Sequence, residues 1–197
     1  MKQQHQAYIY ALSAIVLWST IGTAFKIALR YTDPLQLIFF ASGIGIIIYG
    51  FISFLKGNIS DLLKTNRSEL KQSLSGGFLN PFLYYAVLLQ AYDMTDAQLA
   101  QPLNYLWPVM LVLFSAPLLG EKIRPVGLIS VLVGFVGVFV IASKGEFHNF
   151  QSDDVWGASL AAGSSIIWAL GWIFSKKDRR EESKKLFWNF LFGFIYL

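Results

Sequence analysis

The sequence contains no cysteine, which excludes disulfide bonds, thiolate zinc sites and a cysteine nucleophile. Histidine is scarce too, because only His5 and His148 occur and both lie outside the long apolar segments. No nucleophile–histidine pair, metal-ligand cluster or glycine-rich loop ending in Lys and Ser or Thr can be recognised. These absences argue against an enzyme. They predict no catalytic residue, no cofactor and no metal.

Charged residues make up only 14% of the chain, and the mean hydropathy is +0.50. Both values are typical of a helical membrane protein. The net charge of +4 is scattered over connections and not gathered on a basic face with interleaved aromatics, so no nucleic-acid partner is expected.

What the sequence has in abundance is long apolar runs of about 20 residues, enough for a helix to cross about 30 Å of hydrocarbon. The runs are Ala7–Leu29, Leu35–Leu55, Ser73–Tyr92, Ala97–Leu119, Val126–Ser143 and Val155–Ser175. A seventh run begins at Leu186. The fold class predicted is therefore all-α, a polytopic helical membrane protein in contact with the lipid bilayer.

Positive residues are distributed unequally between the connections of these runs. Of the 16 Lys and Arg residues, 13 lie at the N-terminus or in the second, fourth and sixth connections, 2 lie in the alternate connections, and Lys26 lies within the first run. Because positive residues stay on the cytoplasmic side, this split predicts a cytoplasmic N-terminus in the plasma membrane.

The two ends of the chain carry separate expectations. The start does not resemble a cleaved signal, because the apolar run that follows is too long and more spans come after it. The last run, Leu186–Leu197, would extend only about 18 Å as a helix. We therefore expect a longer parent protein.

One segment is repeated. Ala14–Lys26 (AIVLWSTIGTAFK) and Ser164–Lys176 (SSIIWALGWIFSK) align at an offset of 150, which places Trp18 on Trp168 and Lys26 on Lys176. The second copy would cross the membrane in the opposite direction, as in the inverted repeats of many transporters. Chance and shared hydrophobicity remain alternative explanations of a match that is one helix long.

The fourth run carries the densest set of polar residues. At 100° per residue, Gln98, Gln101, Tyr105 and Pro108 share one helix face, with Asn104 at its edge. Prolines in this run free backbone carbonyls, and irregular backbone at membrane depth is tolerated where it lines a cavity. We interpret this face as a neutral wall that binds substrate. The alternative is that the prolines kink the helix for packing and the amides bond neighbouring helices.

Other candidate site residues lie in three further runs. Tyr84 follows Asn80-Pro81 in the third run and is either a cavity residue or an interhelical hydrogen bonder. Trp18 and Trp168 lie near mid-span, as cavity aromatics would. Lys26 lies one turn from the outer end, where it either snorkels to the interface or forms a charged mouth facing an anionic group.

Two polar connections look structural. We interpret Lys56–Gln72 as a solvated connector with a short helix around Ile59–Lys64, and Asp178–Lys185 as a charged hinge between halves.

Several motifs together resemble the EamA repeat of the drug/metabolite transporter superfamily. They are Trp18-Ser19 with Lys26, Pro34, the tyrosine-rich third run, Asn104–Pro108 (Asn-Tyr-Leu-Trp-Pro), Leu119–Lys122 (Leu-Gly-Glu-Lys) and the glycine-spaced fifth run. Asn104–Pro108 and Val16–Thr20 are most similar to the branch that exports aromatic and other neutral amino acids. Ala41 stands where the family often has an Arg, so that residue's role is absent or moved in this chain.

The resemblance implies ten helices in two inverted repeats around a central cavity. Residues 1–145 would form the first repeat and residues 146–197 the start of the second. It implies a secondary transporter of small metabolites, an amino-acid exporter working by alternating access, with Trp18, Tyr84, Gln101, Asn104, Tyr105 and Trp168 as cavity residues. A flippase-like carrier of a lipid-linked intermediate and a non-transporting single-repeat scaffold remain alternatives, and a homodimer stays open.

Overall fold

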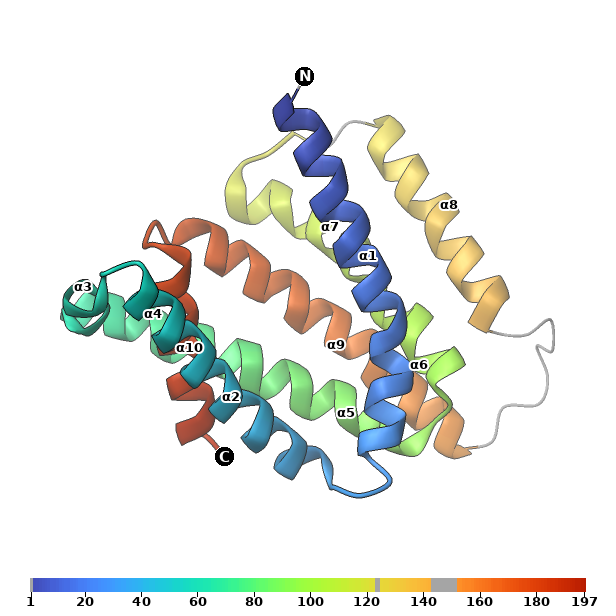
Figure 1. Ribbon diagram of the computed structural model, residues 1–197. Helices are drawn as coiled ribbons and strands as arrows, with labels where there is room; N and C mark the ends of the chain where they lie inside the picture. The colour runs from blue at the N-terminus through green and yellow to red at the C-terminus, as the bar shows by residue number, and fades with distance from the viewer. Residues whose placement is uncertain (1, 123–124, 143–151) are drawn as a thin grey trace.

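The computed structural model describes residues 2–122, 125–142 and 152–197, and the described part is helical (Figure 1). The elements are α1 (Lys2–Ala28), α2 (Pro34–Leu55), α3 (Ile59–Leu63), α4 (Arg67–Gly77), η1 (Phe78–Leu83), α5 (Tyr84–Met94), α6 (Ala97–Asn104), α7 (Trp107–Leu119), α8 (Pro125–Ala142), α9 (Ser152–Lys177) and α10 (Glu182–Ile195). The predicted boundary between repeats, at residue 145, lies outside the described residues.

Four stretches of helix in the described residues are long and apolar enough to cross a membrane. They are Gln4–Ala28, Pro34–Leu55, Ala97–Leu119 and Val155–Lys177, and Pro125–Gly137 is a shorter apolar helix. The all-α polytopic fold predicted from the sequence is therefore confirmed. Because most of the large apolar side chains of α1, α2 and α8 are exposed, these helices present surfaces suited to lipid.

The helices α5 and α9 run side by side through the centre of the molecule and make one of its two most extensive contacts (Figure 1). The helix α1 crosses beside α5 and α6, and α10 packs along α2 and α4. The helix α8 contacts α6 and α7. The core where α5, α6 and α9 meet includes Tyr84, Tyr92 and Ala161.

The third apolar run is not one continuous helix, as its apolar pattern alone would suggest. It is divided into α4, η1 and α5, and Asn80 has a non-helical backbone with φ −150° and ψ 115°. The cause is Pro81, which disfavours helical geometry in the residue before it and has no N–H to donate. The wide π-helical turn η1 ends at Leu83, and α5 begins at the next residue, Tyr84, which belongs to the core.

The fourth run is likewise broken into α6 and α7 at Tyr105 and Leu106. Pro108 cannot donate to the carbonyl of Asn104, and Leu106 instead donates to Leu103 in a tighter turn at 3.2 Å. The predicted polar face assumed unbroken helical rotation through Pro108, so the break moves the residues that follow it to a different direction.

The interpretation of the second connection is confirmed in part, because the short helix α3 lies where it was expected. The run Asp178–Lys185 is not solvated throughout, since Lys184 and Lys185 are buried, at 7% and 3% exposure, and both are hydrogen bonded; its role as a hinge between halves stays a prediction. The helix α10 begins within this run at Glu182, capped by the side chain of Glu181.

Candidate functional site

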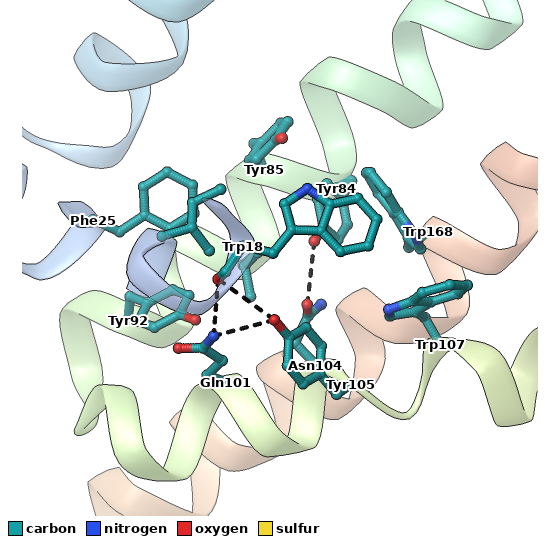
Figure 2. A pocket seen from close by; sticks show the side chains of 12 residues that line it. Trp18, Phe25, Tyr84, Tyr85, Tyr92, Gln101, Asn104, Tyr105, Trp107 and Trp168 are labelled. Atoms are coloured by element: carbon teal, nitrogen blue, oxygen red, sulfur yellow. Dashed lines mark hydrogen bonds between the residues drawn. The ribbon is translucent and has the colours of Figure 1, made fainter. Parts of the chain in front are cut away.

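A small cavity lies where α1, α5, α6, α7 and α9 converge (Figure 2). It is lined by Trp18, Ile21, Phe25, Tyr84, Tyr85, Leu88, Tyr92, Gln101, Asn104, Tyr105, Trp107 and Trp168. The space open to the centre of a water molecule is about 60 Å³, whereas one water needs about 10–15 Å³ by this measure. The cavity therefore has room for a few waters, and a larger ligand would have to displace side chains.

Aromatic rings form most of the wall. The ring centroids of Tyr84 and Trp168 are 4.5 Å apart, and those of Tyr84 and Tyr85 are 4.8 Å apart. Phe25 and Tyr92 meet edge to face at 5.6 Å. None of the described lining residues is charged, so the cavity offers ring faces and neutral hydrogen-bonding groups.

One hydrogen-bonded group joins α6 to the backbone of α1 (Figure 2). Gln101 Nε2 donates to the Trp18 carbonyl and to Tyr105 Oη, each at 3.3 Å. The Tyr105 hydroxyl in turn donates to the same carbonyl at 3.5 Å. These bonds fix the orientation of the Gln101 amide at the edge of the cavity.

A second group joins α5, α6 and α9. The Tyr84 hydroxyl donates to Asn104 Oδ1 at 3.3 Å, Asn104 Nδ2 donates to Ser164 Oγ at 2.8 Å, and Ser164 donates to the Ala161 carbonyl at 2.6 Å. Asn104 is 6% exposed and Ser164 is fully buried, so these bonds satisfy polar groups that water cannot reach.

Gly22 permits the close approach of α1 to the cavity. A Cβ at this position would overlap Gln101 Oε1 and lie 3.1 Å from Tyr92 Oη. Any other residue would therefore displace the Gln101 amide from the position that its two hydrogen bonds define.

The structure brings most of the predicted site residues together around this cavity. Trp18, Tyr84, Gln101, Asn104, Tyr105 and Trp168 line it. Gln98 and Lys26 are absent from the described lining residues; Gln98 is exposed and Lys26 is half-buried. Lys176, the repeat partner of Lys26, forms an ion pair with Glu121 at 2.8 Å.

Reasoning from the sequence missed Ser164, Phe25 and Tyr92. Ser164 lies four residues before Trp168, so it shares that residue's helix face, and this spacing was an available signal. No comparable signal marks Phe25, because its role depends on how α1 meets α5.

A second polar cluster, here called the connector cluster, joins residues 56–73 to residues 178–185. Arg180 bonds Asp178 at 2.6 Å and Ser73 at 2.8 Å. Lys184 Nζ donates to the Lys64 carbonyl. Burial tends to raise the pKa of Asp178, but the Arg180 guanidinium outweighs it and holds that pKa below its usual range.

Glu181 and Lys56 make the exposed edge of the connector cluster. Their N–O distance is 2.7 Å, and the hydrogen bond from Lys56 is the main reason that the pKa of Glu181 falls to about 2. Burial opposes this change, and donation from the Lys184 backbone supports it.

Long apolar helices, backbone broken at proline and a small neutral cavity between the helices together define a polytopic membrane protein. The EamA-like transporter family model matches residues 5–143. This chain belongs to that family, and its apolar helices are those of a multi-pass membrane protein.

Individual relatives agree with this assignment. An uncharacterised transporter of Bacillus subtilis, YvbV, is 31% identical over 83% of this chain and 51% of its own length. The aromatic amino acid exporter YddG of Ancylobacter novellus is 29% identical over 88% of this chain and 59% of its own length. An uncharacterised inner membrane transporter of Escherichia coli, YhbE, is 26% identical over 85% of this chain and 53% of its own length. The chain spans about half the length of these curated relatives.

A crystal structure shares the fold, with a TM-score of 0.72 and 24% sequence identity, over 97% of this chain and 65% of the other. This likeness concerns the arrangement of the helices alone.

Proposed function

We propose that the protein exports an amino acid with an aromatic or other neutral side chain, by alternating access at the cavity between α1, α5, α6 and α9. The observation that carries the proposal is the wall itself, which combines many aromatic rings with two amides and no charged residue among those described. Aromatic pairs add about 0.5–1.5 kcal/mol beyond the area they bury, so such a wall favours a planar ring.

Two further observations support it. The name of the Ancylobacter novellus relative states that it exports aromatic amino acids. The cavity is small, at about 60 Å³, so opening of the wall to admit a ring would couple substrate binding to movement of the helices.

We propose a cytoplasmic N-terminus from the 13-to-2 split of positive residues, which determines the membrane face at which each helix ends. In that orientation α1 ends at the outer face and α9 ends at the inner face. Residues 1–145 as a first repeat and a homodimer stay predictions; light scattering of the detergent-solubilised protein would give its mass and check the second.

The experiment that tests the proposal measures efflux of labelled phenylalanine from proteoliposomes containing the protein. Trp168→Ala removes the ring that lies against Tyr84, and we expect efflux to fall at least tenfold. Trp156→Ala is the matched control, because Trp156 lies on the same helix but is 60% exposed and outside the cavity. Absence of efflux from the wild type, or equal losses in both variants, would contradict the proposal.

A further inference from the structure

In each hydrogen-bonded group around the cavity, the backbone carbonyl at the end determines which atoms donate and which accept. A carbonyl can only accept, so the Ala161 carbonyl takes the single proton of Ser164 Oγ at 2.6 Å. Ser164 must then accept from Asn104 Nδ2, and Asn104 Oδ1 must accept the Tyr84 proton. The Tyr84 oxygen is left with lone pairs and no proton of its own to donate elsewhere.

In the group that reaches the backbone of α1, a carbonyl again determines which atoms donate. The Trp18 carbonyl requires a donor, which forces the Nε2 atom of Gln101 toward it and uses both amide protons, one on this carbonyl and one on Tyr105. Gln101 Oε1 therefore lies on the other side of the amide, away from the Tyr105 hydroxyl, as Figure 2 shows. No hydrogen bond among the described residues reaches this oxygen, which lies against Gly22 with the Tyr92 hydroxyl nearby, since a Cβ at Gly22 would contact both atoms.

Both groups thus leave acceptor oxygens, Gln101 Oε1 and Tyr84 Oη, in residues that line one cavity. A ligand group that satisfies them must donate hydrogen bonds. Most of the other lining residues are aromatic, and ring faces attract cations by about 0.5–2 kcal/mol. A carboxylate finds no Lys or Arg among the described lining residues; the buried donor without a partner there is the single indole N–H of Trp168, which can donate to one carboxylate oxygen but does not neutralise its charge.

We propose that this cavity recognises the protonated amino group of its substrate, with Gln101 Oε1 as the principal acceptor and Tyr84 Oη available to a second N–H. The inference deepens the proposed function by assigning which end of an amino acid this half of the carrier selects. It implies that removing the carboxylate from the substrate lowers the binding affinity less than removing the amine does.

The test compares three ligands that share one ring: phenylalanine, phenethylamine and 3-phenylpropionate. Calorimetry on the protein in lipid nanodiscs gives each Kd. We expect phenylalanine and phenethylamine to bind with similar affinity and 3-phenylpropionate at least tenfold more weakly. Equal binding of phenethylamine and 3-phenylpropionate would overturn the inference.

Two variants connect the result to the named oxygen. Gln101→Glu places a negative charge beside the amine, so the ratio of phenethylamine to 3-phenylpropionate affinity should rise at least tenfold, whatever happens to the absolute values. Gln98→Glu is the matched control, because Gln98 is exposed and does not line the cavity, and its ratio should stay as in the wild type. Equal ratios in the two variants would refute the role of Gln101.

The same measurements separate this inference from the proposed function. Efflux of phenylalanine together with preferred binding of 3-phenylpropionate would refute amine recognition and leave the exporter proposal in place. Selective amine binding without phenylalanine efflux would do the reverse. Failure of all three ligands to bind would refute both.

Discussion

Gly22→Ala should separate function from stability, because of what the added methyl group meets. It would overlap Gln101 Oε1, which is the far end of a flexible side chain, and its next neighbour would be Tyr92 Oη at 3.1 Å. Gln101 can rotate away at about 0.5–1.5 kcal/mol for a strained rotamer. Alanine in place of glycine within a helix returns about 0.5–1 kcal/mol. The two hydrogen bonds that Gln101 Nε2 gives up are exposed, so water can replace them. The other two changes nearly cancel, so the free energy of unfolding should change by less than about 1 kcal/mol.

Ligand binding should respond very differently. Once Gln101 rotates, its Nε2 loses the Trp18 carbonyl and Tyr105, and Oε1 leaves the cavity edge. Loss of even one hydrogen bond to a charged group corresponds to about 1.5–3 kcal/mol, which is at least a tenfold loss of phenylalanine affinity. Thermal unfolding of the purified protein and calorimetric binding measure the two effects separately.

Two other glycines provide the comparison. A Cβ at Gly77 would meet the backbone oxygen of Asn189 at 2.5 Å and the backbone nitrogen of Gly193 at 3.0 Å, so Gly77→Ala should separate α4 from α10 and lower stability markedly. Gly127 has open space around it, and Gly127→Ala should leave both binding and stability unharmed. If Gly22→Ala lowers the unfolding temperature as much as Gly77→Ala does, the reasoning about Gln101 is wrong.

Three further results are expected. Because the pKa of Glu181 is lowered from 4.5 to about 2, its ion pair stabilises the fold above pH 4.5 and this contribution disappears as the pH falls toward 2; Glu181→Gln should remove that part of the acid dependence in unfolding measurements. Ser164→Ala leaves the Asn104 amide without its buried acceptor and should destabilise by about 1–3 kcal/mol in thermal unfolding, whereas no loss would mean that the amide finds another partner. A reporter fused after Lys71 should be cytoplasmic and one after Asp96 external, and the reverse pattern would refute the topology.

The helices could be predicted from the sequence because the length and apolar composition of each run are those that a membrane-spanning helix needs. The family motifs likewise indicated which helices surround the cavity. The orientation within the fourth run could not be predicted as well, since a helical wheel assumes constant rotation and the turn at Tyr105 and Leu106 interrupts it. Asn104 precedes that turn and was placed at the edge of the expected face for a different reason: a helical wheel does not include the partners 20 and 60 positions away that hold its side chain.

The connector cluster shows the same limit more strongly. A run of charged residues is predicted to be solvated when its hydrogen-bond partners are unknown. Here those partners lie far away in the sequence. Arg180 bonds Ser73 across 107 positions, and Trp188 bonds the Leu62 carbonyl across 126. No local pattern predicts burial that depends on such pairs.

These long separations also set an order of events during synthesis. The carbonyls of Leu62 and Lys64 and the hydroxyl of Ser73 leave the ribosome more than 100 positions before the side chains that bond them. At about 5–20 residues per second, the interval is roughly 5–25 seconds. During that time the connection after α2 is present without its partners, so the nascent protein passes through a stage in which its first spans are inserted but this surface is uncovered. Arrival of residues 178–188 ends that stage, and protection of the connection from protease should therefore appear late and in one step.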